Sequence, residues 1–281
     1  MIGLAVLALL GFAANSVLAR LALGSGRIDP ASFTAIRLAA GALVLWLLLR
    51  RQPVATVPGP RSARWTGAAL LFLYAAPFSF AYVSLPTGTG ALVLFGAVQL
   101  TMIGAALRGG ERPRPREWIG LLLAMVGLVY LNLPGIGAPD PAGVALMALA
   151  GVAWGLYSLR GRTAGPPLRR TAESFIFAMP FGIVLAALAR SQAHLSMPGV
   201  WCAVASGALA SGGGYAVWYA VLPSLSATRA GTIQLAVPVV AALAGTAILG
   251  ERIPLRLVMS GTAILGGVAL AISARAVSAN R

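Results

Sequence analysis

Aromatic and uncharged polar side chains recur inside the long apolar segments of this sequence, where their chemistry suits binding a ligand rather than transforming one. Tyr74, Phe78 and Tyr82 follow one another at i, i+4 and i+8, a spacing that places them on one face of a helix. Further residues of this kind are Asn15, Ser16, Ser79, Gln99, Trp154, Tyr157, Ser158, Tyr215, Trp218 and Gln234. Buried amides and hydroxyls are unfavourable unless they are hydrogen-bonded or hydrated, so we expect this set to face other helices or a water-filled cavity.

These residues also have structural interpretations that the sequence leaves open. Tyr82 lies near the end of its apolar segment, where aromatic residues often form interfacial belts. Gln99 and Gln234 can hydrogen-bond across helices without contacting a ligand. The tryptophans and tyrosines of the second half of the chain are favoured as cavity residues.

The ionisable residues argue against an enzyme, a metal site and a bound cofactor. All six acidic residues lie in loops or at the ends of apolar segments, and so does the single histidine, His194. The sequence therefore places no carboxylate inside the apolar segments, where one could bind a proton or a sodium ion, and no base there for hydrolysis. It also contains no lysine, which excludes a Walker-type phosphate loop. We expect no catalytic residue, no metal and no cofactor.

Arg37 is the exception among the charged residues, because it lies about two turns into an apolar segment. A charged group at the centre of a membrane helix costs about 2.5–3.5 kcal/mol on insertion scales. Its side chain can extend toward the outer interface, with Asp29 as partner. It can also attract a substrate carboxylate or lock an outward gate, and the sequence leaves these alternatives open.

Membrane-spanning helices must position these residues. Of the 281 residues, 59% are hydrophobic and 10% are charged, and the mean hydropathy is +0.87, which leaves too little polar surface for a water-soluble domain. A helix needs about 20 residues to cross the hydrocarbon core of a bilayer. The sequence predicts an all-α integral membrane fold of ten such spans, at residues 2–23, 31–49, 64–84, 87–107, 116–133, 142–159, 172–189, 197–222, 229–249 and 255–275.

The arginines orient these spans. All 21 basic residues are arginine, and all but Arg37 lie in loops, tails or the last turn of a span. If the chain starts in the cytoplasm, most of them face the cytoplasm, as the positive-inside rule requires, so both termini are predicted to be cytoplasmic. The same placement argues against nucleic-acid binding, which a net charge of +15 would suggest in a soluble protein.

An internal duplication is indicated by GERPRPR at 110–116, which is nearly repeated as GERIPLR at 250–256. YVSLP at 82–86 and YAVLP at 219–223 match in the same order. We interpret these matches as two repeats, residues 1–135 and 141–276. Each holds five spans, an odd number, so the second repeat enters the membrane in the opposite orientation. Inverted repeats of this kind are typical of secondary transporters.

The sequence resembles the drug/metabolite transporter superfamily, specifically its ten-helix members with two EamA-type repeats. The resemblance extends over essentially the whole chain. It rests on the two five-span halves and on GGER (109–112), LGER (249–252), GTAILGGVAL (261–270), FTAIRLAAGAL (33–43) and YVSLP (82–86). Among the subgroups, the chain looks most like the bacterial aromatic amino acid exporters.

This resemblance implies a basket-like bundle in the bacterial inner (plasma) membrane. Spans one, three, four, six, eight and nine would surround a central cavity, with spans five and ten at the periphery. The resemblance adds Phe95 to the cavity candidates given above. Small multidrug relatives use a glutamate in the first helix, where this chain has Ala14 and Asn15, so that coupling scheme is not expected here.

The expected function is that of a secondary transporter that exports amino acids and similar small metabolites by alternating access. An aromatic-rich cavity favours aromatic or apolar side chains, and the lack of a buried carboxylate favours facilitated movement down the substrate gradient. Its partners would be the lipid bilayer and a small-molecule substrate, and we expect a monomer. Two alternatives stay open: a polyspecific exporter of cationic aromatic drugs, held by cation–π contacts, and a membrane scaffold or receptor that transports nothing.

Overall fold

Long helices dominate the computed structural model, which describes residues 2–50, 61–109, 115–133, 138–161, 167–221 and 234–279. They are α1 (Ile2–Leu23), α2 (Pro30–Leu49), α3 (Arg61–Ala81), α4 (Thr87–Arg108), α5 (Pro115–Asn132), α6 (Pro141–Gly161), α7 (Pro167–Leu188), the 3₁₀ turn η1 (Arg190–Gln192), α8 (Met197–Ala205), the π-helix η2 (Ser206–Gly213), α9 (Gly214–Val221), α11 (Ala236–Leu249) and α12 (Leu255–Ala279). Within these ranges, the β-type pairing is an isolated bridge between Ile28 and Leu195.

Helices lie at nearly the predicted positions of the spans. Helix α1 has the predicted bounds, whereas α7 begins at Pro167 instead of residue 172 and α3 ends at Ala81 instead of residue 84. Six helical segments of the described chain are long and apolar enough to cross a membrane: Gly3–Leu23, Pro30–Leu49, Thr87–Ala105, Pro141–Arg160, Leu168–Leu188 and Met197–Trp218. Residues 229–233, the start of the ninth predicted span, lie outside the described residues.

Side-chain caps fix where several helices begin. The Asp29 carboxylate accepts hydrogen bonds from the Ser32 N–H at 2.8 Å, at the start of α2, and from the His194 N–H at 3.2 Å. Asp140 precedes α6 and accepts from the Ser84 hydroxyl at 2.7 Å and the Gly143 N–H at 2.8 Å. These hydrogen bonds, above all the one from the Ser84 hydroxyl, stabilise the charged carboxylate and hold the pKa of Asp140 below its ordinary value. Two of the acidic residues that the sequence placed in loops therefore serve as helix caps.

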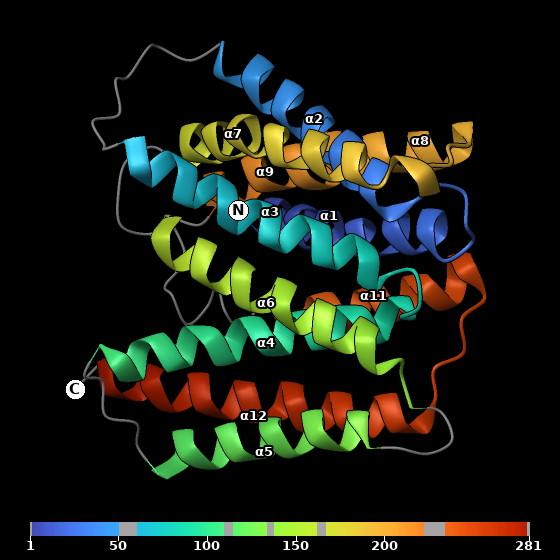
Figure 1. Ribbon diagram of the computed structural model, residues 1–281. Coiled ribbons are helices and arrows are strands. Elements are labelled where there is room, and N and C mark those ends of the chain that lie inside the picture. The colour runs from blue at the N-terminus through green and yellow to red at the C-terminus, as the bar shows by residue number, and fades with distance from the viewer. Residues whose placement is uncertain are drawn as a thin grey trace.

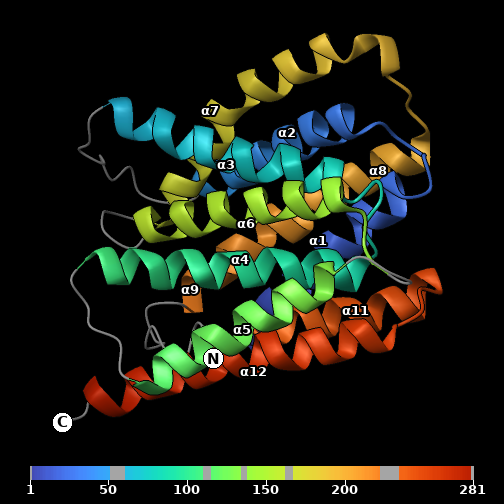
Figure 2. The same cartoon turned by 60° about the horizontal axis from the view of Figure 1, so that its bottom comes forward.

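The helices lie side by side in a bundle, with α1 in its interior (Figure 1). Helix α1 contacts α4, α8, η2, α9 and α11. Helices α5 and α12 pack against each other along one edge in both views (Figure 2), and α2 packs on α7 on the other side of the bundle. Residues of α1 are therefore well placed to line an internal cavity.

The outside of the bundle is apolar. On α5, the side chains of Ile119, Leu122 and Val126 are about 57–63% exposed. On α7, Ile183, Val184 and Leu188 are exposed as well. Continuous apolar faces of this size are rare on soluble proteins, and they suit contact with lipid chains.

Close glycine contacts hold α5 and α12 together, which leads to a stability prediction. A methyl group at Gly267 would overlap the Gly120 carbonyl and approach the Ala124 nitrogen to 2.6 Å. Gly267→Ala is therefore expected to destabilise the protein by about 1–3 kcal/mol, because the two helices must separate. Thermal unfolding of the purified protein in detergent measures this effect.

Gly266→Ala is the matched control. A methyl group at Gly266 would meet nothing within 4 Å. Both substitutions gain the same helix propensity, about 1 kcal/mol. The difference between their unfolding temperatures therefore isolates the steric overlap, and equal temperatures would show that α5 and α12 do not approach each other at Gly267.

The eighth predicted span is not one regular α-helix. Residues Ser206–Gly213, with sequence SGALASGG, form a π-helix between α8 and α9. Gly207 lies so close to the Arg37 carbonyl that a side chain at this position would overlap it, so α2 and η2 are in contact through their backbones. Short π-helical segments occur frequently at functional sites.

Candidate functional site

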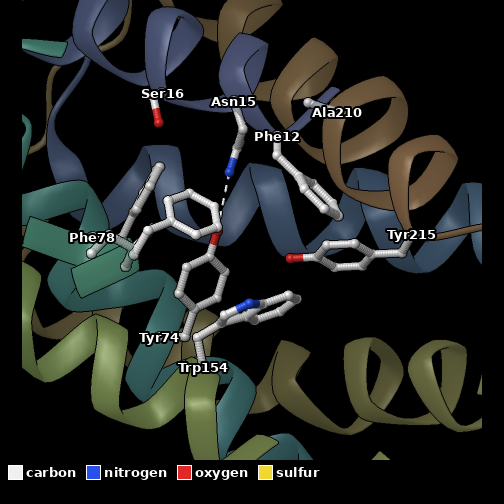
Figure 3. Close-up of a pocket in the computed structure, with 10 residues that line it drawn as sticks. Phe12, Asn15, Ser16, Tyr74, Phe78, Trp154, Ala210 and Tyr215 are labelled. Carbon is white, nitrogen blue, oxygen red and sulfur yellow. Dashed lines mark hydrogen bonds between the residues drawn. The ribbon is translucent and has the colours of Figure 1, made fainter. Parts of the chain in front are cut away.

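A small cavity lies inside the bundle, where α1, α3, α4, α6, η2 and α9 meet (Figure 3). Its lining consists of Phe12, Asn15, Ser16, Tyr74, Phe78, Leu94, Phe95, Trp154, Ala210 and Tyr215. Its volume is about 20 Å³, which is room for about one water molecule. Admission of an amino-acid-sized ligand therefore requires the lining side chains or their helices to move apart.

Trp154 forms the centre of an aromatic wall. Its ring stacks on Tyr215 at 5.0 Å between centroids and on Tyr157 at 5.5 Å, and it lies 4.9 Å from the Tyr74 ring. Phe12 packs against Tyr215 from α1, at 5.9 Å. Because these rings come from α1, α3, α6 and α9, separation of those helices would open flat aromatic faces to a ligand.

The Tyr74 hydroxyl is the polar centre of the site. It accepts a hydrogen bond from Arg37 Nη2 at 2.7 Å and another from Asn15 Nδ2 at 3.1 Å. The Asn15 carbonyl oxygen accepts from the Ser206 hydroxyl of η2. This network joins α1, α2, α3 and η2, so the apolar bundle contains a connected polar core.

Arg37 is buried inside the protein, with 1% of its surface exposed. Its guanidinium lies over the rings of Tyr74 and Phe78, at 5.0 and 4.7 Å from their centroids, and its Nε donates to the Ser211 hydroxyl at 3.4 Å. The hydrogen bonds described for Asp29 are those to the Ser32 and His194 amides. The side chain therefore does not extend to the outer interface, and the suggested pairing with Asp29 is not found.

Half of the residues expected to bind substrate line this cavity. They are Asn15, Ser16, Tyr74, Phe78, Phe95, Trp154 and Tyr215. The structure places the others outside the lining. Tyr157 stacks on Trp154, Trp218 packs against Phe12, and Ser79 accepts a hydrogen bond from Thr34 of α2 at 2.8 Å.

The remaining expected residues lie nearer the helix ends or deeper between helices. Tyr82 is fully buried, and its hydroxyl donates a hydrogen bond to the Thr87 carbonyl at 3.4 Å. It therefore does not belong to an aromatic belt at the membrane interface. Gln99 is buried, and its Nε2 has no hydrogen-bond partner among the described residues. Ser158 and Gln234 are partly buried.

Several residues of the site were not expected from the sequence. Phe12, Leu94 and Ala210 line the cavity, and Ser206 and Ser211 belong to the polar network. Phe12 precedes Asn15 by three residues and Ser16 by four, so helical spacing would have placed it on the same face. The serines and Ala210 belong to a run of small residues, which signals close packing more directly than binding.

A second polar network closes the end of the bundle at which α1 ends and α2 begins. The Arg20 guanidinium pairs with the Glu251 carboxylate at 3.2 Å and donates to the Tyr82 and Val83 carbonyls at 3.2 and 2.9 Å. The other Glu251 oxygen accepts from the Thr87 N–H at 2.9 Å, at the start of α4. One carboxylate thus links α1, the start of α4 and the segment after α11.

The LGER sequence at 249–252 has a structural role in this network. Gly250 ends α11 in the left-handed conformation, with φ of 67°, which favours glycine. The turn directs the chain back, so the Glu251 N–H bonds the Gly245 carbonyl and its side chain reaches α4. Glu111, the matching glutamate of the predicted first repeat, lies outside the described residues.

Comparison with known proteins places these features in context. The chain is 50% identical over 274 residues to the uncharacterized protein PA1977 of Pseudomonas aeruginosa, covering 97% of this chain and 94% of that protein. It is 29% identical over 252 residues to the threonine/homoserine exporter RhtA of Escherichia coli, covering 86% and 82%. It is 27% identical over 223 residues to the uncharacterized inner membrane transporter YedA of Escherichia coli, covering 77% and 72%.

A solved crystal structure shares the fold, with a TM-score of 0.65 at 22% sequence identity over 96% of this chain and 98% of that one. The EamA-like transporter family matches two segments, residues 1–133 and 141–273, which together make up most of the sequence. The expected resemblance to the drug/metabolite transporter superfamily is thereby confirmed. The apolar helices and these relatives identify a multi-pass inner membrane protein, and the chain belongs to the EamA-like transporter family.

Proposed function

We propose that this protein is a secondary transporter that exports amino acids, favouring aromatic and apolar side chains, by alternating access and without a coupling ion. The observation that carries the proposal is the internal cavity, which combines an aromatic wall with a hydrogen-bonding centre. The rings suit an apolar side chain, and the hydroxyl and amide groups suit the polar end of an amino acid. The relative whose name specifies threonine and homoserine export supports an amino acid substrate.

We further propose that residues 1–135 and 141–276 are inverted repeats with both termini in the cytoplasm. The helix packing supports this arrangement. The main contacts between two helices have counterparts between the corresponding helices of the other repeat. Helix α5 packs on α12 and α2 on α7, and each of these pairs joins corresponding helices. The contact of α4 with α6 corresponds to that of α11 with α1, and the contact of α3 with α6 corresponds to that of α8 with α1. Such symmetry lets one repeat take the other's conformation and open the opposite side.

In this proposal, the Arg20–Glu251 network is the contact that closes the outward end. It joins α1 of the first repeat to the segment after α11 of the second. The two side chains are 23% and 17% exposed, so water can replace their hydrogen bonds when the helices separate. A partly exposed ion pair of this kind stabilises a closed state modestly and can be broken within a transport cycle.

Proteoliposomes that contain the purified protein test the transport proposal. Labelled phenylalanine, tryptophan and threonine are supplied without an ion gradient, with empty liposomes as the control. Saturable equilibration above the control is the expected result. Accumulation that is driven by a pH gradient and persists after removal of the membrane potential would contradict facilitated transport.

Export of cationic aromatic drugs is the second candidate, and the stacked rings of Trp154, Tyr157 and Tyr215 favour it through cation–π contacts. A cationic dye would then compete strongly with any transported amino acid. The buried positive charge of Arg37 argues against this candidate. It lies over the neighbouring rings of Tyr74 and Phe78, where it repels a second cation.

A further inference from the structure

We infer that Arg37 and the Tyr74 hydroxyl make the cavity a site for the carboxylate group of the substrate. This inference rests on the proposed transport function and adds the chemical group that is recognised. The first observation is the uncompensated charge of Arg37. Its side chain is 1% exposed, and its Nη1 has no hydrogen-bond partner among the described residues. The ion pairs described for Glu173 and Glu251 are with Arg20, Arg64 and Arg169.

A buried cation without a counter-ion is unfavourable in a low-dielectric interior. The Tyr74 and Phe78 rings and the Ser211 hydroxyl offset part of this cost. They supply no negative charge. A substrate carboxylate would supply that negative charge. The unpaired positive charge of Arg37 therefore favours binding of an anionic group.

The Tyr74 hydroxyl connects this charge to the cavity. Its oxygen accepts from both Arg37 and Asn15, so its single hydrogen must be donated in another direction. Two donors on the oxygen, one of them charged, polarise the O–H bond and make it a stronger donor. Figure 3 shows the Tyr215 hydroxyl pointing toward Tyr74 across the cavity. Whichever of these two hydroxyls donates to the other, one hydroxyl hydrogen is left for an acceptor from the ligand.

The aromatic wall completes the site for a zwitterion. With the carboxylate at Tyr74, the ammonium group and the side chain would face the rings of Trp154 and Tyr215, which accept cations and apolar groups on their faces. The structural contacts of Arg37 with α3 and η2 leave Nη1 unused. A role limited to holding helices together would not require that group.

Ligands that differ only at the carboxylate test the inference. Phenylalanine, phenylalaninamide, phenethylamine and 3-phenylpropionate are compared for ligand-induced thermal stabilisation of the purified full chain and for inhibition of phenylalanine uptake in proteoliposomes. We expect phenylalanine and phenylpropionate to bind at least tenfold more tightly than the amide and the amine. Equal binding of the amide and phenylalanine would overturn the inference, and transport by the protein would stand.

Variants separate recognition from folding. Arg37→Gln is expected to weaken phenylalanine binding at least tenfold and to bring the phenylalanine-to-amide ratio near one, whereas Arg37→Lys retains part of the preference. Tyr74→Phe keeps the ring and removes the hydroxyl, so it should reduce the same ratio if Arg37→Gln does not fold. Thr34→Val, one turn away on α2, removes a buried hydrogen bond to Ser79 and should leave the ratio unchanged.

An unchanged ratio in folded Arg37→Gln and in Tyr74→Phe would overturn the inference. A different outcome is that none of the four probes binds and that no tested amine or amino acid is taken up above the level of empty liposomes. The proposed function then fails, and this inference fails with it. Uptake of amines without uptake of carboxylates would contradict only the inference about Arg37 and would favour the cationic-drug candidate.

Discussion

Replacing Trp154 with alanine is expected to reduce phenylalanine transport at low substrate concentration by about tenfold or more. The Trp154 ring lies within 5.5 Å of the Tyr74, Tyr157 and Tyr215 rings and is the central ring of the cavity wall. An aromatic pair contributes about 0.5–1.5 kcal/mol beyond the area it buries, and about 1.4 kcal/mol corresponds to tenfold in binding. Initial rates over a range of phenylalanine concentrations measure the effect, which we expect mainly as a higher KM.

Loss of a tryptophan also leaves a void, so the test must separate binding from stability. Trp154→Phe retains a ring and should restore most of the transport. Leu156→Ala, two positions along α6 on a side chain that is 41% exposed, is the control for a truncation that does not reach the cavity. Thermal unfolding of each purified variant shows how much of it is folded.

The choice of substrate distinguishes ring recognition from general packing. Threonine has no ring to stack, so Trp154→Ala should affect threonine transport much less than phenylalanine transport. A similar loss for both substrates would show that Trp154 supports the cavity without contacting the substrate side chain. It would also remove the basis for a preference for aromatic amino acids.

Span positions were the most predictable part of this protein. Continuous apolar runs of membrane length have one stable solution in lipid, because the backbone must satisfy its own hydrogen bonds. Helix α1 therefore has the predicted bounds. The π-helix at Ser206–Gly213 was not predictable, because i→i+5 hydrogen bonding leaves no mark in the hydropathy of the sequence. The close approach of Gly207 to α2 in the same segment is a contact between distant parts of the chain.

The residue types of the site could be predicted from the sequence, but the helix faces that turn toward the cavity could not. Tyr74, Trp154 and Tyr215, which were expected because they are large polar or aromatic residues in apolar spans, lie in the cavity lining. Helices that are apolar on every side do not reveal which face turns inward. Gln99 and Trp218 were expected on the same grounds and lie outside the lining. Their orientation is set by contacts between helices that are distant in the sequence.

The partner of Arg37 illustrates a different limit. Asp29 lies eight residues earlier, and charge alone made it a reasonable partner. In the structure its carboxylate caps α2 and bonds the His194 amide, because unpaired N–H groups at a helix start compete for the same oxygen atoms. The other roles considered for Arg37, attraction of a substrate carboxylate or locking of a gate, did not depend on this pairing.

In the proposed arrangement, Glu251→Gln is expected to open the end of the bundle that faces outward and to slow substrate exchange by about tenfold. The substitution removes the negative charge that Arg20 and the Thr87 N–H share. Hydrogen bonds to charged groups contribute about 1.5–3 kcal/mol. Since both side chains are partly exposed, we take the lower end of that range, or about tenfold in the balance between closed and open states.

Two measurements report on this balance. In a Cys202→Ser background, a cysteine in place of Ser16 at the cavity should react about tenfold faster with a membrane-impermeant maleimide in spheroplasts when Glu251 is replaced by glutamine. Exchange of labelled phenylalanine across proteoliposomes should slow, because a carrier that does not close one end cannot complete its cycle. Glu173→Gln breaks the ion pair of Arg64 between α3 and α7 at the opposite end, and it should not increase the maleimide reaction.

A double-mutant cycle shows whether Arg20 and Glu251 act together. Arg20→Gln removes the same ion pair and also the hydrogen bonds to the Tyr82 and Val83 carbonyls, so it should open the end at least as much as Glu251→Gln. Combining both substitutions should add little, because the second has no partner left to lose. Additive effects would show that the two residues stabilise separate contacts. An unchanged maleimide rate in both single variants would show that closure of this end depends on apolar helix packing instead.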